Sequence, residues 1–487
     1  MTKFFRYGSL ATICVILQLA LLIAAIFLVS SLPLVRFFLH ILTIICVFVQ
    51  LNSDISPAYK LCWAVFMLIF PSYGGIFFLL FNKRHSVNSI HRKMKPFFAE
   101  NSAAERIIPQ KGIQTYLESA SFPPVSCAQQ RYFGTGEDLY SEMIKQIKNA
   151  QKYVLLEFFI VSEGEIWQQT EQLLAQKVRE GVKVYLITDD AGCLFTKPVG
   201  FEKRMAELGI ELRKFNPVTP CLTSRVGYRN HRKMVICDGK TAFCCGLNLA
   251  DEYMNVKEKY GRWKDSGVMI TGGGAAQFTQ MFRNMWAYLS NDNEFPFTIS
   301  SEYEQKYLVQ PFSDTPLDNE SIGLRTYLIL INSAAESVRL TTPYLICSDE
   351  MLNALCCAAL RGVKVQIITP HIPDKKAVFM LTRGFYGELL RSGVEIYEYA
   401  PGFIHAKSLL IDGETAVVGT VNYDYRSMYL LFECGCVFYG GDVPQQLADD
   451  FLQTLTECIK ITYDKIPKNN IFVKLARGFL YLFAPLV

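Results

Sequence analysis

The sequence predicts an α/β protein in which two related lobes follow an apolar N-terminal region. The first observation is a repeated pattern of one histidine, one lysine and one aspartate at equal spacings. Its two copies are His231, Lys233 and Asp238, and His405, Lys407 and Asp412. A second repeat, Gly-Val-Lys-Val, contains Lys183 in one half and Lys364 in the other. Because both repeats occur in the same order, the duplication covers a whole lobe and predicts a pseudo-twofold pair.

Three apolar stretches in residues 1–84 predict a membrane anchor. Residues 8–32 are long enough for a transmembrane helix, since about 20 apolar residues cross a bilayer. Residues 37–51 predict a second helix. The third stretch, 61–81, is interrupted at Pro71, which favours a kinked span or a re-entrant segment.

Basic residues flank the anchor on both sides, and the positive-inside rule places both flanks in the cytoplasm. Lys3 and Arg6 precede the first stretch, while Lys83 and Arg84 follow the third. Two crossings and a re-entrant third stretch satisfy this rule. We therefore expect a multi-pass membrane protein with cytoplasmic catalytic lobes, in which the fifteen cysteines are mostly free thiols.

Strands and helices alternate after a polar connector at 85–125, and this alternation favours mainly parallel sheets covered by helices. The first lobe is expected at 126–300 and the second at 301–465. The expected helices are 139–150, 166–180 and 348–361, and the expected strands are 153–161, 182–188, 333–346 and 362–368. Residues 466–487 form an amphipathic, basic segment that suits either an anionic membrane or the enzyme's own core.

The duplicated pattern suits phosphate chemistry. Residues i and i+2 of a strand share a face, so each copy is expected to present an imidazole and an ammonium together. One neutral imidazole can attack phosphorus while a second, protonated imidazole donates to the leaving oxygen. The lysines would hold the nonbridging oxygens, and an asparagine seventeen positions after each histidine, Asn248 or Asn422, would donate to the same group.

These residues resemble the phospholipase D superfamily, whose signature is His-x-Lys, four residues, Asp, six residues and Gly-Ser-x-Asn. The surrounding segments resemble bacterial cardiolipin synthases, and they are 156–160, 228–233, 342–344 and 398–405. This chain departs from the signature at three positions. Cys245 replaces the first copy's glycine, Gly246 replaces its serine, and Thr420 replaces the second serine but keeps a hydroxyl.

The resemblance implies that two phosphatidylglycerol molecules react to give cardiolipin and glycerol through a phosphatidyl-histidine, at the cell membrane of a bacterium. His231 is expected to attack phosphorus and His405 to act as acid and base. The implied substrate ligands are Asn248, Asn422 and Thr420.

Each catalytic imidazole also needs a carboxylate that orients its other nitrogen. The downstream candidates are Asp265 in the first lobe and Glu433 in the second. Asp238 and Asp412 belong to the catalytic pattern, but we expect them to brace the motif loops through hydrogen bonds.

Composition narrows the possible partners. The net charge of +4 is too small to favour nucleic acid, which calls for a concentrated basic face. The cysteines and histidines lack zinc-ligand spacing, so we expect no metal ion and no other cofactor. Membrane lipids are the expected partners. The alternatives are a membrane phospholipase D, a phosphatidyltransferase with another acceptor, and a catalytically silent membrane scaffold.

Overall fold

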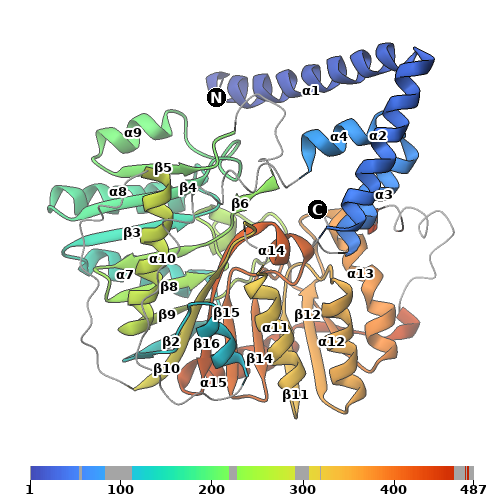
Figure 1. Ribbon diagram of the computed structural model, residues 1–487. Helices are drawn as coiled ribbons and strands as arrows, with labels where there is room; N and C mark the ends of the chain where they lie inside the picture. Colours follow the sequence, from blue (N-terminus) through green and yellow to red (C-terminus); the bar gives the residue numbers. More distant parts are fainter. Residues whose placement is uncertain are drawn as a thin grey trace.

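The computed structural model describes residues 2–53, 57–82, 112–218, 227–290, 306–317, 320–465, 478, 480 and 481 of the chain. Two lobes, each built on one β-sheet, stand side by side, and the N-terminal helices lie along one side of them (Figure 1). Each lobe carries one copy of the duplicated motif. The predicted two-lobe α/β repeat is confirmed.

The first lobe contains a seven-stranded sheet in the order β2-β9-β8-β7-β3-β4-β5. Its strands are β2 (Gln130–Phe133), β3 (Tyr153–Phe158), β4 (Lys183–Asp189), β5 (Glu211–Phe215), β7 (Met234–Cys237), β8 (Thr241–Cys245) and β9 (Gly267–Thr271). Only β3, β4 and β5 pair in parallel, and every other neighbouring pair in this sheet is antiparallel.

The second sheet repeats this order in its centre, as β10-β16-β15-β14-β11-β12-β13, and adds β1 and β17 at its two ends. The short strand β6 of the first lobe pairs with β16. The strands are β1 (Val125–Cys127), β6 (Arg229–Asn230), β10 (Tyr307–Asp314), β11 (Ser337–Thr341), β12 (Lys364–Pro370), β13 (Glu395–Tyr399), β14 (Ser408–Ile411), β15 (Thr415–Gly419), β16 (Leu431–Tyr439) and β17 (Cys458–Ile461).

The prediction of mainly parallel sheets is wrong, because both sheets are mixed. The helical crossovers that predicted parallel pairing join only β3 to β5 and β11 to β13. The motif strands β7 and β14 instead enter tight hairpins. Asp238 and Gly239 both have positive φ, of 55° and 65°, and Asp412 and Gly413 have 51° and 72°. Asp-Gly at two consecutive positive φ values is typical of a tight hairpin turn. The amides of Lys240 and Glu414 close these turns on the carbonyl oxygens of Cys237 and Ile411, and the flanking strands pair antiparallel.

Helices cover the outer faces of the sheets, and an apolar core lies between the lobes. This core joins Ile236 and Cys244 of the first sheet to Val418 and Cys434 of the second. The helices are α6 (Ile113–Ser119), α7 (Gly136–Asn149), α8 (Glu165–Arg179), α9 (Phe201–Glu207), α10 (Gly273–Ser290), α11 (Ile322–Ser333), α12 (Asp349–Leu360), α13 (Lys376–Arg391), α14 (Tyr425–Tyr429) and α15 (Asp442–Leu455), with 3-10 turns η2 (Asp251–Met254) and η3 (Tyr463–Lys465).

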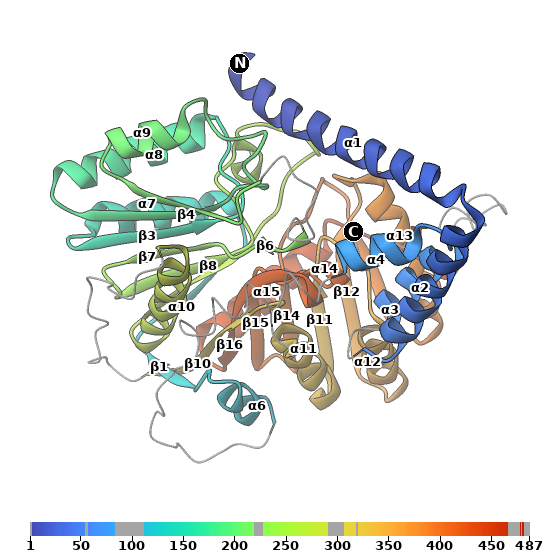
Figure 2. The ribbon, with the colours of Figure 1, turned by 45° about the horizontal axis from the view of Figure 1, so that its top comes forward.

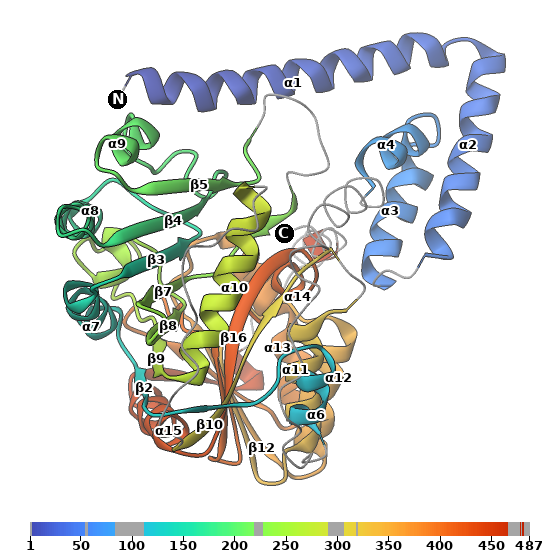
Figure 3. The same cartoon turned by 60° about the vertical axis from the view of Figure 1, so that its left-hand side comes forward.

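Four helices form the N-terminal region: α1 (Thr2–Ser30), α2 (Pro33–Leu51), α3 (Pro57–Ile69) and α4 (Gly74–Phe81). α1 extends over the first lobe, and α2 to α4 stand beside the second (Figure 1 and Figure 3). Within the described residues, only α2 is both long and apolar enough to cross a membrane. The expected multi-pass topology is therefore not supported, and the cytoplasmic side of the lobes stays a prediction.

The third apolar stretch breaks where Pro71 predicted a break. The Thr43 hydroxyl of α2 donates to the Pro71 carbonyl oxygen (2.7 Å) and accepts a hydrogen bond from the Gly75 amide (3.0 Å). The turn between α3 and α4 is thus fastened to α2. The last two residues of the predicted anchor, residues 85–111 of the predicted connector and nearly all of the predicted C-terminal segment lie outside the described residues. The predicted domain boundaries remain predictions.

Candidate functional site

Each motif histidine is anchored by the backbone of the opposite lobe. The His231 amide donates to the carbonyl oxygen of Phe432 in β16 (2.9 Å), and the His405 amide donates to the carbonyl oxygen of Lys264 (2.7 Å). Both histidines are buried. They lie in irregular backbone just before β7 and β14, so the prediction that each His-x-Lys pair sits on a strand is wrong. The exchange of backbone contacts brings the two motifs together where the lobes meet.

The two candidate carboxylates are also exchanged between the lobes. His231 Nδ1 lies 2.9 Å from Glu433 Oε1 and 3.0 Å from Oε2, while His405 Nδ1 lies 2.7 Å from Asp265 Oδ2. A carboxylate on Nδ1 fixes that nitrogen as the N–H donor and leaves Nε2 for chemistry. The sequence identified both carboxylates but gave no sign of this crossed pairing.

The motif lysines face their own histidines. Lys233 Nζ donates to the His231 carbonyl oxygen (2.7 Å), and Lys407 Nζ donates to the His405 carbonyl oxygen. Both ammonium groups are fully buried. Burial lowers the pKa of Lys233 to about 8 and the pKa of Lys407 to about 7. An anionic phosphodiester at this site would restore the charged form of both lysines, because opposite charge favours it.

Both imidazoles are neutral near pH 7 in the absence of substrate. Burial lowers the pKa of His231 well below 6.5, and Lys233, Lys407 and His405 lower it further. Burial and Lys407 lower the pKa of His405 to about 4, although Asp265 opposes this shift. These influences agree with the contacts of each histidine with the opposite lobe, which bring the two motifs together.

The orienting carboxylates differ in charge. Burial raises the pKa of Glu433 well above its usual value, and Lys233 and the Thr420 hydroxyl only partly offset this. Burial also opposes ionisation of Asp265, but His405, Lys407 and the Ser266 amide together hold the pKa of Asp265 below its usual value. Asp265 is therefore an anion, whereas Glu433 tends towards the neutral acid.

The motif aspartates bind backbone at the far ends of β7 and β14 from the histidines. Asp238 accepts from the amides of Gln151, Lys152 and Tyr153 at 2.7–2.9 Å. Asp412 accepts from the amides of residues 335–337 at the same distances. These are the contacts of a brace, as expected. Their placement in the catalytic group stays a prediction, and any effect they have on the reaction would act through the motif loops.

The two asparagines are not equivalent. Asn248 Oδ1 accepts from the Ile160 amide (3.0 Å), and its Nδ2 donates to the Tyr253 hydroxyl (2.7 Å), so it is engaged within the first lobe. Asn422 Oδ1 is buried and has no hydrogen-bond partner among the described residues. Asn422 is thus the less engaged of the two, and the predicted ligand role of Asn248 requires it to exchange partners.

Thr420 and Gly246, which depart from the family signature at equivalent positions, have different contacts. The Thr420 hydroxyl donates to Glu433 Oε2 and therefore supports a carboxylate instead of facing a substrate. At the equivalent position of the first lobe, a Cβ added to Gly246 would lie 2.2 Å from Asp265 Oδ1. The missing serine leaves the space that the Asp265 carboxylate fills. The predicted substrate-binding role of Thr420 remains untested.

Aromatic rings around the histidines were missed by the sequence reasoning. Trp263, Tyr253 and Phe403 lie 5.2, 5.4 and 5.9 Å from the His405 ring, measured between centroids. Phe159 lies 5.3 Å from the His231 ring. Trp263 lies two residues before Asp265, and Phe403 lies two residues before His405. This spacing could have indicated that the two rings share a face with the site residues.

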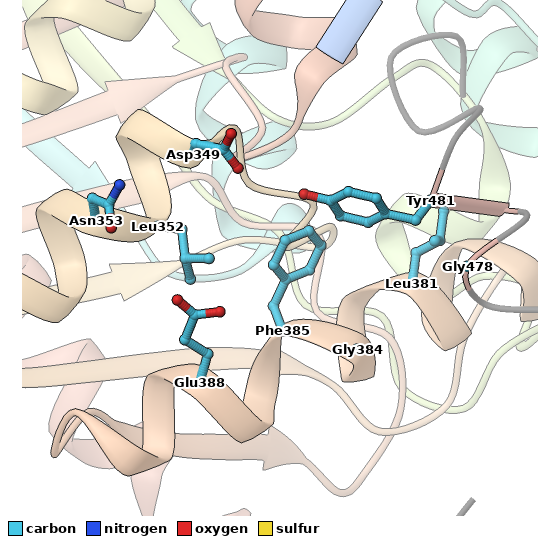
Figure 4. Close-up of a pocket in the computed structure, with 9 residues that line it drawn as sticks. All are labelled: Asp349, Leu352, Asn353, Leu381, Gly384, Phe385, Glu388, Gly478 and Tyr481. Carbon is cyan, nitrogen blue, oxygen red and sulfur yellow. The ribbon is translucent and has the colours of Figure 1, made fainter. Parts of the chain in front are cut away.

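One cavity lies apart from this site. Figure 4 shows a pocket of about 480 Å³ between α12, α13 and Tyr481, whose ring centroid is 5.7 Å from that of Phe385. Its acidic residues, Asp349 and Glu388, are exposed, and it contains none of the predicted site residues. The ring contact between Tyr481 and Phe385 shows that the described part of the C-terminal segment docks on the second lobe.

Comparisons with known proteins match most of the chain. A family model described as "Cardiolipin synthase, PLD-like domain" matches residues 143–286 and 327–455. An uncharacterized protein of Streptococcus mutans is 38% identical over 454 residues, which cover 90% of this chain and 98% of that protein. A cardiolipin synthase of Geobacillus kaustophilus is 32% identical over 455 residues, covering 89% of each chain.

A solved structure shares the fold. Phosphatidylserine synthase of Haemophilus influenzae has a TM-score of 0.60 at 15% identity and covers 77% of this chain and 100% of that one. At this identity the likeness concerns the fold alone. The family model and the relatives over nearly the whole chain show more: this chain belongs to the cardiolipin synthase family of the phospholipase D superfamily, a family of phosphatidyltransferase enzymes.

Proposed function

We propose that this protein is a cardiolipin synthase that transfers a phosphatidyl group from one phosphatidylglycerol to another and releases glycerol. One observation carries the proposal. Two buried histidines, each paired through Nδ1 with a carboxylate of the opposite lobe, share one site with two buried lysines. This set provides a nucleophile, a proton donor and fixed positive charge, which phosphodiester transfer requires.

In the first step, His231 Nε2 attacks the phosphorus of the donor lipid. The bond between phosphorus and the headgroup oxygen breaks, and His405 gives a proton to the departing glycerol. The bound phosphate anion and ionised Asp265 both favour the imidazolium form of His405, so lipid binding itself prepares the acid. Lys233 and Lys407 hold the negative charge that builds on the nonbridging oxygens.

In the second step, His405 accepts a proton from the terminal hydroxyl of a second phosphatidylglycerol. That oxygen attacks phosphorus, the phosphorus–nitrogen bond breaks, and His231 is released unchanged. Water could attack the same intermediate and give phosphatidic acid. The aromatic rings of Trp263, Tyr253 and Phe403 around His405 favour the lipid alcohol, since they leave little room for loose water beside the base.

The assignment of His231 as nucleophile rests on its carboxylate. An acid catalyst needs a stabilised imidazolium, and the ionised Asp265 supplies that stabilisation to His405. A nucleophile needs a neutral imidazole, and His231 lies beside two lysines and a carboxyl group that tends towards neutral. The two environments therefore favour different roles for two equivalent residues.

The test is product analysis with purified protein and phosphatidylglycerol, with and without a chelator. We expect cardiolipin and glycerol in equal amounts, and a loss of at least about 1,000-fold in His231→Ala and in His405→Ala. Phosphatidic acid as the main product would identify a phospholipase D and would rule out the lipid acceptor. Absence of turnover with any phospholipid would favour a silent scaffold.

A second substrate separates the roles of the histidines. A phosphodiester with a p-nitrophenol leaving group departs without a proton donor. His405→Ala should therefore still release p-nitrophenol in a burst and accumulate the covalent intermediate, whereas His231→Ala should release none. The opposite pattern would exchange the two roles and leave the overall reaction intact.

A further inference from the structure

A synthase that joins two phosphatidylglycerols must hold two phosphates, and only one of them reacts. We propose that Arg426 binds the phosphate of the acceptor lipid and thereby directs its terminal hydroxyl towards His231. This inference rests on the proposed function. It assigns to Arg426 a positioning role that differs from those of the four motif residues at the reacting phosphorus.

Arg426 reaches the site through a helix that leads directly into it. It lies in α14, which follows Asn422 and precedes β16. β16 pairs with β6 through Leu431 and Arg229, and its Phe432 carbonyl oxygen accepts from the His231 amide. Figure 2 shows α14 and β6 where the two lobes meet. The backbone of Arg426 is therefore tied to the segment that carries the nucleophile.

The guanidinium group of Arg426 has no assigned protein partner. Among the residues that the structure describes, it makes no hydrogen bond or ion pair. The two nearest carboxylates are engaged elsewhere: Asp424 caps α14 by accepting from the Ser427 amide (2.8 Å), and Asp189 accepts from the amides of Ala191, Gly192 and Asn230. A largely buried cation without a partner is costly, and an anion that enters the site removes this cost.

The surroundings of Arg426 are positive as well as buried. Burial lowers the pKa of Arg426, and the nearby Arg229 lowers it further, while Asp424 and Asp189 oppose the shift. Arg229 is already held by the Asn216 carbonyl oxygen at 3.0 Å. Of these two arginines, Arg426 is thus the one whose planar guanidinium group can bind two phosphate oxygens. Arginine is favoured over lysine for such two-point binding of phosphate.

Arg426 lies outside the ring of groups at the reacting phosphorus. It stands in α14, four residues after Asn422, whereas Lys233 and Lys407 contact the carbonyl oxygens of the two motif histidines. A phosphate held by Arg426 would therefore lie beside the reacting phosphate and not on it. In phosphatidylglycerol, one glycerol unit separates the phosphate from the terminal hydroxyl, so a phosphate at Arg426 lets that hydroxyl reach the phosphorus on His231. α14 also lies towards the N-terminal helices, the side from which a membrane lipid would enter (Figure 3).

Two acceptors that differ by a phosphate test this role. Labelled glycerol can attack the phosphatidyl-enzyme and yield labelled phosphatidylglycerol, a reaction that needs no acceptor phosphate. Phosphatidylglycerol as acceptor yields cardiolipin. In Arg426→Gln we expect the KM for the acceptor lipid to rise about 10- to 100-fold, because a charge-assisted contact is lost, while glycerol exchange stays within about twofold of wild type.

The controls separate this inference from the function on which it rests. Arg426→Lys should recover part of the lost affinity, and Arg391→Gln, which changes an exposed arginine of α13, should leave both reactions unchanged. Equal losses of exchange and condensation in Arg426→Gln would overturn the acceptor role and leave the synthase standing. Glycerol exchange by wild-type protein without any cardiolipin would instead overturn the proposed acceptor, and this inference with it.

Discussion

The two copies of the motif have the same spacing but occupy unlike environments. Among the described residues, three aromatic rings lie near His405, which pairs with the ionised Asp265. One ring, that of Phe159, lies near His231, which pairs with Glu433, whose pKa burial raises. The comparison teaches that the repeat supplies the reactive groups and that residues outside it set their roles. A symmetric sequence thus yields an asymmetric site.

The same contrast appears one layer behind the histidines. Thr420 gives Glu433 a hydroxyl donor. Gly246 at the equivalent position gives Asp265 only space, and that carboxylate is stabilised by the charge of Lys407 and by hydrogen bonds from His405 and the Ser266 amide. The two lobes thus hold an imidazole in different ways. One uses the longer Glu433 with a hydroxyl partner, and the other uses the shorter Asp265 beside a glycine. Asp265 is ionised in its arrangement, whereas Glu433 tends towards the neutral acid.

The largest expected effect comes from neutralising the two carboxylates separately. Asp265→Asn should lower kcat for cardiolipin formation about 1,000-fold, because the imidazolium of His405 loses its counter-charge. Glu433→Gln should lower kcat only about tenfold, since an amide replaces a carboxyl that tends towards neutral. Steady-state kinetics would measure kcat for both variants. Equal losses of kcat would contradict the different roles assigned to the two histidines.

Exchanging the residues behind the carboxylates should have an intermediate effect. Gly246→Ala places a methyl group against Asp265 Oδ1 and should displace that carboxylate from His405, which lowers kcat about 100-fold. Thr420→Val should cost about tenfold through the lost donor to Glu433. Circular dichroism on both proteins controls for folding. Wild-type activity in a folded Gly246→Ala protein would show that the Asp265 position is not tightly constrained.

The smallest expected effect is a change of kcat/KM with pH, which depends on the two motif lysines. The pKa values of about 7 for Lys407 and about 8 for Lys233 mean that the free enzyme loses both positive charges as pH rises through this window. We expect kcat/KM to fall above about pH 7, because kcat/KM reports groups of the free enzyme. The bound phosphate raises both pKa values, so kcat should stay level to higher pH. A kcat/KM that remains constant up to about pH 9 would contradict buried, depressed lysines.

Sequence reasoning found the lobes and the residues of the candidate site because both are carried by local patterns. The repeated motif gave His231 and His405, and α12 and β12 were placed to within two residues. The strand expected at 333–346 was too long, because β11 covers only Ser337–Thr341 and residue 333 belongs to α11. The parallel sheets were wrong because the Asp-Gly turns at Asp238 and Asp412 were counted as motif residues and not as hairpin turns.

The rest could not be predicted because it depends on how the lobes pack. Nothing in the local sequence says that Glu433 pairs with His231, since this contact arises only when β16 of one lobe meets β6 of the other. The pKa shifts likewise follow from burial between the lobes. Arg426 was one of several arginines near the motifs, and only the spatial neighbourhood distinguishes it.

The crossed pairing has a consequence for the chain during its synthesis. The first lobe leaves the ribosome with His231 and Lys233 but without Glu433, and its own Asp265 has no histidine to orient. A half-translated protein therefore lacks the contact that holds the His231 imidazole. Under the proposed mechanism, reactivity would arise only when the second lobe docks, so an incomplete chain would not cleave lipids.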